Sequence, residues 1–447
     1  MHSIISVLRA ILPGPILGAY HWTLAFLAAV RYGFPSRNLT VAGVTGTDGK
    51  TTVVHLLHEM LASAGHRVGS LSSLRFRIGE REESNFLKMT MPGRFRLQRF
   101  LADCRKAGCA FAVIEVTSQG IAQHRHRCIN FKAAVLTNIT PEHIESHGGF
   151  EQYRAAKMRL FRILPKTGYA ILNREDAPSR LFAGATAARV VWYSRVAIDG
   201  AGISHPVRVV TANQDHIALE IGNVSVETVL GGEFNVMNIL AAAAAAMSFD
   251  VPLVAIATAL KEFPGMAGRL EYVVREPFAV VVDYANTPAA YERVYQSLQE
   301  ARSPAPVPLP AGRYGASKKQ EARLICVFGA PGGGRDKWKR PELGRIASRY
   351  CEEIILTSDD PEDEEPNRIV SEIRSGMTND QLLMTKVILD RREAIRAAFE
   401  EARPGDTVII TGMGAQPWLM LKTGKIPWDD RRIVREELTK LRSGGKL

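Results

Sequence analysis

Cysteine is scarce in this 447-residue sequence and follows no paired motif. No two of the five cysteines have the CxxC spacing, so the pattern predicts neither a disulfide framework nor a zinc ribbon. A reducing, cytoplasmic setting fits such cysteines best. They are Cys104, Cys109, Cys128, Cys326 and Cys351.

Long hydrophobic runs are also missing. Residues 4–12 and 16–30 are apolar, but a Pro-Gly-Pro break separates them, and the longer run has 15 residues. A membrane-spanning helix needs about 20 residues, and no small-residue cleavage site follows. Residues 1–36 therefore form either a membrane-surface segment or a helix packed on the protein. We favour packing on the protein, with three aromatic anchors: Tyr20, Trp22 and Phe26.

The bulk composition is that of an ordinary globular protein. Hydrophobic residues make up 46% of the chain and charged residues 23%, and no repeat of fixed period is present. The length predicts two or three domains. The formal net charge of +11 suits a polyanionic substrate or an anionic surface, although a generally basic surface explains it equally well.

The stretch at residues 39–65 dominates what the sequence does contain. A β-branched strand at 39–44 is followed by a glycine-rich turn and a helix at 51–64, which Gly65 closes. Such a turn cradles phosphates through backbone N–H groups, with Lys50 reaching the β and γ oxygens and Thr51 holding Mg²⁺. The glycines at 43, 46 and 49 depart from the strict Walker A spacing. We predict that the chain binds a nucleoside triphosphate.

Beyond this motif, the pattern alternates between strands and helices. Strands are expected at 111–116 and 133–137, antiparallel strands within 207–229, and helices at 150–164, 235–248 and 252–263. The alternation restarts near Gly268 and predicts a second doubly wound sheet. Residues 303–320 are rich in proline, glycine and basic side chains and indicate an exposed loop.

Three polar residues could carry chemistry, and each is a weak signal by itself. Glu115 ends a buried strand, where ligands bind in parallel sheets, but a carboxylate there is more often a cap or an ion pair. His143 could equally be a satisfied loop residue, and Lys157 a solvated helix residue. Together with Thr51 they could supply oxygen and nitrogen ligands to Mg²⁺.

Two sets of motifs follow one another along the chain. The stronger ones are GVTGTDGKTT (43–52), EVTSQGIAQHR (115–125), LTNITPEHIESHGG with YRAAKMRLF (136–161), GEFNVMN (232–238), AGRLE with VDYANTP (267–288) and VFGAPGGGRDKWKRP (327–341). The weaker ones are SDDPEDEEP (358–366), DRREAI (390–395), GDTVIITGMG (405–414) and DDRRIVREEL (429–438). In this order they resemble the motifs of the Mur ligases, and most closely those of the UDP-N-acetylmuramoyl-tripeptide synthetase branch of that family.

The resemblance implies a fold and a domain division. It implies an α/β protein with a P-loop-type central ATPase domain and a doubly wound, Rossmann-like C-terminal domain. The expected divisions are a short apolar segment at 1–38, the ATP-binding domain at 39–268 and the C-terminal domain at 269–447. The family's substrates are small molecules, so we expect no nucleic-acid partner.

The resemblance also implies roles for individual residues. Thr51 and Glu115 match ligands of a first Mg²⁺, and His143 and Lys157 match ligands of a second, with the lysine as its carbamate. Positions that hold the muramoyl-peptide substrate match Thr90, Thr117, Ser118 and Arg125. Positions that contact ATP match Gly46, Thr47, Asp48, Gly49, Lys50, Thr51, Thr52, Asn138, Asn235, Asn238, Arg269 and Asp283.

The sequence departs from the family pattern in three places. Only 38 residues precede the first strand, where relatives have a domain that grips uridine diphosphate. Asn286 replaces a common histidine, and residues 413–416 replace a Lys-Gly-His-Glu pattern. The motif that selects diaminopimelate becomes Asp-Asp-Pro-Glu, which places Asp360 and Glu362 in the amino-acid pocket and reverses the charge of an arginine. This reversal predicts a basic amino acid such as lysine or ornithine, unless the acidic run is a solvated helix N-terminus.

The implied activity is that of an ATP-dependent carboxylate–amine ligase. A carboxylate would attack the γ-phosphate, and an amino acid would displace phosphate from the acyl phosphate to form an amide. Relatives that act on lipid-linked substrates with an amidotransferase carry a four-cysteine zinc insert, which these cysteines cannot make. Folylpolyglutamate synthetase is a less favoured alternative, because its phosphate-binding loop has GKG-Ser in place of Gly49-Lys50-Thr51. An alternative from a different class is a membrane-associated binding protein that uses ATP only as a switch. Detection of an amide product would distinguish a ligase from such a protein.

Overall fold

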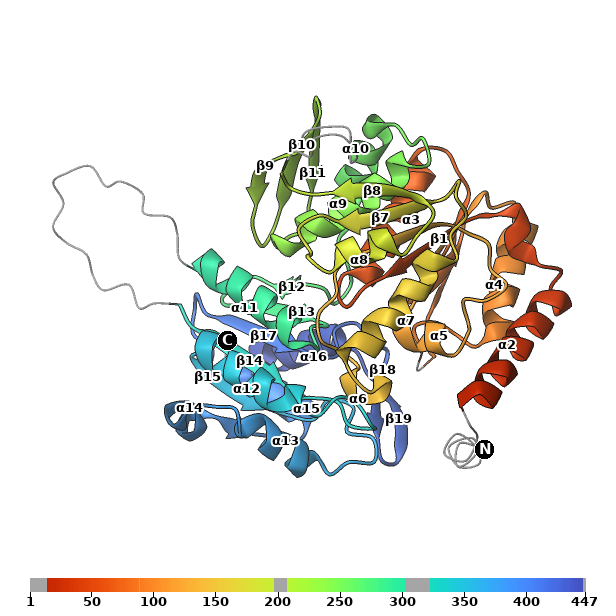
Figure 1. The fold of residues 1–447 in the computed structure, drawn as a ribbon. Helices are drawn as coiled ribbons and strands as arrows, with labels where there is room; N and C mark the ends of the chain where they lie inside the picture. Colours follow the sequence, from red (N-terminus) through yellow and green to blue (C-terminus); the bar gives the residue numbers. More distant parts are fainter. Residues whose placement is uncertain (1–13, 88, 197–206, 303–321, 445–447) are drawn as a thin grey trace.

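Two α/β units make up the part of the chain that the computed structural model describes, residues 14–87, 89–196, 207–302 and 322–444 (Figure 1). The first unit contains β1–β11 and the second contains β12–β19. The α/β class expected from the sequence is confirmed. The predicted loop at 303–320 lies outside the described residues.

An eight-stranded sheet forms the centre of the first unit, in the order β4-β3-β2-β5-β1-β6-β7-β8. The inner strands pair in parallel, as apolar strands that are buried on both faces do. The strands are β1 (Thr40–Thr45), β2 (Val68–Leu71), β3 (Arg75–Ile78), β4 (Arg81–Ser84), β5 (Phe111–Glu115), β6 (Phe131–Leu136), β7 (Tyr169–Asn173) and β8 (Arg189–Tyr193).

Helices cover both faces of this sheet because its strands present apolar side chains on both sides. On one face Val44 packs with helices α3, α9 and α10, and on the other Val41 packs with α4, α7 and α8. The helices are α3 (Lys50–Ser63), α4 (Arg94–Lys106), α5 (Ser118–Ala122), α6 (Ile144–His147), α7 (Phe150–Arg162), α8 (Ser179–Gly184), α9 (Phe234–Met247) and α10 (Leu253–Glu262).

A small antiparallel sheet completes the first unit. Strands β9 (Val207–Ala212), β10 (Ile217–Ile221) and β11 (Val224–Thr228) pair in the order β11-β10-β9. The alternating pattern within 207–229 predicted them, and alternate residues of β10 are buried. They lie beside α10 (Figure 1).

The second unit repeats the layered design around a six-stranded sheet, in the order β12-β13-β17-β14-β15-β16. The edge strand β12 is antiparallel, and the other pairs are parallel. Its strands are β12 (Glu271–Val274), β13 (Ala279–Asp283), β14 (Leu324–Phe328), β15 (Glu353–Leu356), β16 (Lys386–Val387), β17 (Thr407–Thr411), β18 (Trp418–Leu421) and β19 (Gly424–Pro427). Its helices are α11 (Pro288–Arg302), α12 (Lys339–Tyr350), α13 (Pro366–Arg374), α14 (Asn379–Met384), α15 (Arg391–Glu401) and α16 (Asp430–Ser443).

Ahead of the first sheet, α2 (Gly14–Arg31) and the 3₁₀ turn η1 (Pro35–Asn38) pack against α4. The expected packing on the protein is confirmed, but the expected anchors are wrong. Small residues make the contact, including Ala25, Ala28 and Ala29, which are at most 1% exposed. Tyr20, Trp22 and Phe26 are exposed instead. No helix in the described ranges has the length and hydropathy needed to cross a membrane.

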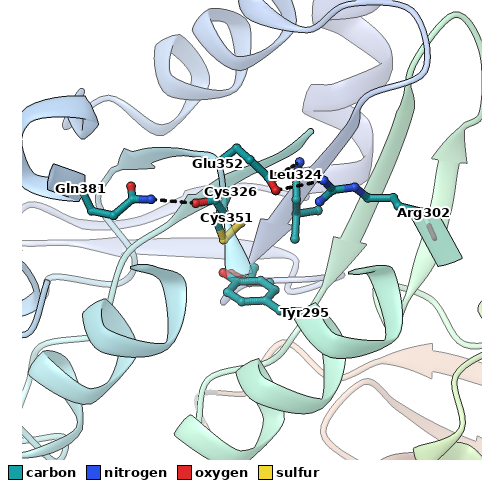
Figure 2. The surroundings of a disulfide bond; sticks show 8 residues. Tyr295, Arg302, Leu324, Cys326, Cys351, Glu352 and Gln381 are labelled. Atoms are coloured by element: carbon teal, nitrogen blue, oxygen red, sulfur yellow. Dashed lines mark hydrogen bonds and ion pairs between the residues drawn. A yellow bond between two sulfur atoms is a disulfide. The ribbon is translucent and has the colours of Figure 1, made fainter. Parts of the chain in front are cut away.

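A disulfide in the second unit corrects the expectation drawn from cysteine spacing. Cys326 of β14 and Cys351, just after α12, are joined and buried, and 25 residues separate them in sequence (Figure 2). The sheet creates this proximity, because β14 and β15 pair in parallel. The neighbouring Glu352 carboxylate accepts hydrogen bonds from the backbone N–H of Leu324 and from Arg302. The other cysteines are free.

Reduction of this disulfide should destabilise the protein. A cross-link that closes a loop of this length contributes about 3 kcal/mol in the chain-entropy model. We expect a reductant to lower the urea midpoint of the wild type and to raise its titratable thiols from three to five. A Cys326→Ala/Cys351→Ala variant should not respond to the reductant. A wild-type midpoint that stays constant while the two extra thiols appear would contradict this account.

Candidate functional site

The loop between β1 and α3, residues 46–49, is shaped to admit phosphate and is called here the phosphate loop. Gly46 and Gly49 have φ angles of +149° and +79°. A Cβ on Gly46 would lie 1.9 Å from Thr137 Oγ1, and one on Gly49 would lie 2.2 Å from Asn238 Oδ1. Glycine is therefore required at both positions. Helix α3 begins at Lys50, so its free N–H groups face the loop.

Residues after β6 hold the phosphate loop in place. The backbone N–H of Asp48 donates to Asn138 Oδ1 at 3.0 Å, and Thr137 Oγ1 donates to the Asp48 carbonyl at 2.6 Å. The N–H of Thr47 donates to the Asn138 carbonyl at 3.0 Å. Lys50 Nζ donates to the Thr47 carbonyl at 2.6 Å. The lysine ammonium therefore lies over the loop, where a phosphate would be bound.

Hard oxygen ligands meet at the carboxyl end of β5. The Thr51 hydroxyl donates to Glu115 Oε2 at 2.9 Å, and the N–H of Ser73 donates to the same atom at 2.9 Å. Glu115 is 2% exposed. Carboxylate and hydroxyl oxygens are ligands that Mg²⁺ accepts, so this donor set fits the ion implied by the sequence.

Lys157 and His143 lie behind the loop in surroundings that disfavour their charged forms. Burial, and secondarily Lys50, lowers the pKa of Lys157 well below its ordinary value, and its Nζ donates to the Gly46 carbonyl at 2.6 Å. Burial, with Arg335 and Lys157 adding to it, lowers the pKa of His143 to about 2. For both groups the lowered pKa weakens the charged form relative to the neutral one, and only the neutral form has a lone pair that can bind a metal ion. Among the described residues, no three His, Cys, Asp or Glu side chains form a ready metal cluster.

A cleft of about 460 Å³ opens between the two units above the phosphate loop. Of the predicted residues, those that do not line it are Gly46, Ser118, Arg125, Lys157, Asp360 and Glu362. The predicted residues that do line it are Thr47, Asp48, Gly49, Lys50, Thr51, Thr52, Thr90, Glu115, Thr117, Asn138, His143, Asn235, Asn238, Arg269 and Asp283.

The second unit contributes a cation and a buried carboxylate to this cleft. The Arg269 guanidinium lies 4.3 Å from the centroid of the Tyr284 ring. The Asp283 carboxylate accepts the N–H groups of Leu270 and Ala285, each at 2.6 Å. These bonds fix the backbone next to Arg269. Burial raises the pKa of Asp283.

Three sets of contacts join the units around the cleft. Asp48 of the phosphate loop forms an ion pair with Arg293 of α11 and accepts the Thr287 hydroxyl at 3.2 and 3.3 Å. Asp336 accepts the N–H groups of Ile144 and Glu145, each at 3.1 Å. The third contact is the Lys339–Glu142 ion pair, at 3.2 Å. The structure is therefore in a closed arrangement.

The predicted substrate residues lie in two places. Thr117 caps α5, Ser118 Oγ is 3.1 Å from His147 Nε2, and Arg125 bonds the Met91 carbonyl. Asp360 lies in the second unit, where it accepts the N–H of Met420 at 2.6 Å and the Gln416 amide at 2.8 Å.

Glu362 adjoins the glycine loop that precedes Arg335. A Cβ on Gly333 would lie 2.1 Å from Glu362 Cδ. The acidic motif at 358–366 therefore packs on the motif at 327–341, next to the cleft but not in its lining.

Sequence reasoning gave no role to several charged residues of the cleft. Glu142 and Arg335 lie within quoted motifs, as does Lys339, which pairs with Glu142, so a signal for them was available. Arg195 and Arg293 lie outside the quoted motifs and had no signal, because their positions depend on how distant segments fold together.

The phosphate loop, with a second unit closing cations over it, defines a nucleotide-dependent enzyme whose substrates meet between two domains. The profile of the Mur ligase middle domain matches residues 44–246, and that of the Mur ligase glutamate ligase domain matches residues 268–414. The chain belongs to the Mur ligase family, whose members are ATP-dependent carboxylate–amine ligases that use ATP and Mg²⁺.

Individual relatives agree with this assignment. The chain is 36% identical over 447 residues to the UDP-N-acetylmuramyl-tripeptide synthetase of Roseiflexus sp. (strain RS-1), covering 94% of this chain and 83% of that protein. It is 37% identical over 428 residues to the UDP-N-acetylmuramoyl-L-alanyl-D-glutamate–2,6-diaminopimelate ligase of Gloeobacter violaceus, covering 95% and 82%.

Solved structures show the same fold. A UDP-N-acetylmuramoyl-L-alanyl-D-glutamate–2,6-diaminopimelate ligase superposes with a TM-score of 0.56 at 28% identity, over 90% of this chain and 79% of that one. The Mycobacterium tuberculosis folylpolyglutamate synthase superposes with a TM-score of 0.67 at 17% identity, over 88% and 92%. At that identity the second likeness concerns the fold alone.

Proposed function

We propose that this Mur ligase adds an amino acid to the carboxylate of a muramoyl-peptide-like acceptor during peptidoglycan precursor synthesis. The observation that carries the proposal is the closed cleft, in which the phosphate loop and the Thr51–Glu115 oxygen pair face Arg269 and Arg335 of the second unit. The printed names of the relatives above describe ligases of such peptides.

The reaction would proceed in two transfers. The acceptor carboxylate attacks the γ-phosphorus of ATP, which gives an acyl phosphate and ADP. The amine of the amino acid then attacks the acyl carbon, the amide bond forms, and phosphate leaves with loss of one proton. Lys50 would exchange the Thr47 carbonyl for phosphate oxygens and would stabilise the negative charge of the transferring group.

The units would divide this work between them. We propose that residues 39–268 bind ATP and that residues 269–447 carry the amino acid and close over it. The contacts of Asp48, Asp336 and Lys339 support this division because each joins the two units beside the cleft. Closure would exclude water from the acyl phosphate.

Two Mg²⁺ ions would fit the donors around the phosphate loop. Thr51 and Glu115 would hold the first, and His143 and a carbamylated Lys157 would hold the second. Burial disfavours the ammonium form of Lys157. The neutral amine is the form that can attack CO₂, and the carbamate forms with release of a proton. When bound, the ions would offset charge on the phosphates.

Substrate positions follow from the remaining side chains. Thr90 and Thr117, with Ser118 and Arg125 beside them, would hold the acceptor at one end of the cleft. Arg335 would pair with the α-carboxylate of the amino acid. The Asp360 and Glu362 carboxylates would attract a distal ammonium. Burial, and the Glu362 carboxylate beside it, raise the pKa of Asp360, and a cation there would relieve this repulsion.

Location remains a prediction. We propose a cytoplasmic enzyme, with residues 1–36 making peripheral contact with a membrane.

Replacing Lys50 tests the assigned activity. Lys50→Ala should reduce ATP-dependent amide formation by about 10²-fold or more, because a cation that stabilises the transferring phosphoryl group is lost. Thermal unfolding should change little, and Lys261→Ala, an exposed lysine on α10, should behave as wild type. The assay is chromatographic detection of amide product and ADP. Near-normal ligation by Lys50→Ala would refute the site.

Lys157 is expected to carry a carbamate. Lys157→Ala should lose activity, and short carboxylates should restore part of it by supplying the missing oxygens. Carbon-13 NMR of the Mg²⁺-loaded enzyme in labelled bicarbonate should show a carbamate signal that Lys157→Ala lacks and that the exposed-site variant Lys166→Ala retains. A fully active enzyme with a bare amine at Lys157 would contradict this role.

The amino-acid preference is expected to follow the charge of Glu362. In competition, the wild type should prefer lysine over diaminopimelate, by up to about 10²-fold for a partly buried charge pair. Glu362→Arg should reverse the ratio. The matched control is Glu365→Arg, an exposed position in the same acidic run. A wild type that prefers diaminopimelate, or a ratio that Glu362→Arg leaves unchanged, would show that Glu362 is not the selector.

A further inference from the structure

Helix α2 buries its small side chains and exposes its large apolar ones, which is the reverse of the usual arrangement. Surface helices normally turn large apolar side chains inward and polar ones outward. On α2 the buried face consists of His21 and three alanines. The large apolar residues of the outward face are Ile16, Tyr20, Trp22, Phe26, Leu27 and Val30.

The outward face is ordered by its own contacts. Trp22 and Phe26 are 47% and 40% exposed, and their rings stack with centroids 5.5 Å apart and an interplanar angle of 4°. The alanines fix the helix against α4, and Arg105 of α4 donates to the Gly33 carbonyl at 3.4 Å. A contiguous apolar patch held in this way normally marks an interaction surface.

Positive charge predominates on the segments that carry and support this face, namely α2, η1 and α4. The chain has no Asp or Glu before Asp48. The neighbouring α4 has one acidic residue, Asp103, which is paired with Arg99 at 3.7 Å. The exposed cations on and beside α2 and α4 are Arg31, Arg37, Arg96, Arg99, Arg105 and Lys106.

We propose that the outward face of α2, with these cations, docks on an anionic lipid surface. Trp and Tyr side chains suit the headgroup region, and the aliphatic side chains suit the acyl boundary below it. Each Arg or Lys gains free energy near anionic headgroups. The helix would lie along the surface with its apolar face toward the lipid.

The charges favour a lipid surface over a second copy of the chain. A pairing of α2 with a second α2 would leave Arg31 and Arg37 without an acidic partner on that helix, because no Asp or Glu precedes Asp48, whereas anionic headgroups would pair with them. The position of α2 also suits surface binding. It lies on the outer side of the first unit, away from the second (Figure 1), so docking leaves closure of the cleft unhindered.

Vesicle co-sedimentation of the full chain tests the apolar part of the proposal. The wild type should bind vesicles of phosphatidylglycerol and phosphatidylcholine, and bind weakly to phosphatidylcholine alone. Trp22→Ser/Phe26→Ser should bind the anionic vesicles roughly tenfold or more weakly, since two interfacial aromatic groups are lost. Val254→Ser, which changes an exposed valine on α10, should bind as wild type.

Charge removal tests the electrostatic part and does not depend on the aromatic variant folding well. Arg31→Gln/Lys106→Gln should weaken binding about fivefold per charge, and added salt should remove the difference. Lys261→Gln is the matched control. Ligase activity in vesicle-free solution is measured alongside, so a failure of docking is distinguished from a failure of the catalytic assignment.

Three results would overturn the proposal. The wild type could remain in the supernatant with anionic vesicles. The Trp22→Ser/Phe26→Ser variant could bind them as tightly as wild type, which would place the contact elsewhere. Sedimentation velocity could show a wild-type dimer that this variant converts to a monomer, with no vesicle binding by either, and the face would then pair two copies of the chain.

Discussion

The site depends on the attachment of the phosphate loop to the end of β6. Thr137 and Asn138 bond both the carbonyl and the N–H of Asp48, and these bonds fix the backbone that must cradle phosphate. The Asp48 side chain is thereby turned toward the second unit, where it meets Arg293 and Thr287. One residue thus has its backbone held by the first sheet and its carboxylate held by the second unit. The position of the phosphate loop and the docking of the second unit therefore depend on the same residue, Asp48.

The same compactness gathers three groups that can carry positive charge around the loop. Lys50, Lys157 and His143 lie close enough that Lys50 contributes to the lowered pKa of each of the other two groups. Without anionic ligands, burial and this repulsion disfavour the charged forms of Lys157 and His143. Phosphate, carboxylate or carbamate groups relieve that opposition, so the protein side of the site is complementary to anions before any ligand arrives.

Local sequence was sufficient for much of the fold. The strands expected at 111–116 and 133–137 correspond to β5 and β6 to within two residues at each end, because short apolar runs bounded by turn residues favour buried strands. The phosphate loop could be predicted from the sequence because its glycines and Lys50 lie within a few residues of one another. The β18–β19 hairpin and α16 were not predicted as elements, because their patterns are short or strongly polar.

The predictions failed where the answer depends on contacts between segments that are distant in the sequence. Cysteine spacing could not show that parallel strands bring Cys326 to Cys351. The apolar content of α2 predicted contact with the protein, but which face makes that contact depends on the close approach of α4, which only alanine permits. Arg293 entered the site by the same route, from a helix more than 200 residues beyond the loop it meets.

The cap that Asp336 places on α6 has a consequence for the timing of catalysis. His143 immediately precedes this one-turn helix, and the carboxylate that accepts its first N–H groups comes from the other unit. If the units separated, those N–H groups would lose their acceptor. Docking of the second unit therefore stabilises the turn that carries His143, in addition to the ring contact that His143 makes with Tyr153 of the first unit. Such an arrangement would restrain futile hydrolysis of ATP, because the site is most firmly held when both halves of the reaction are enclosed.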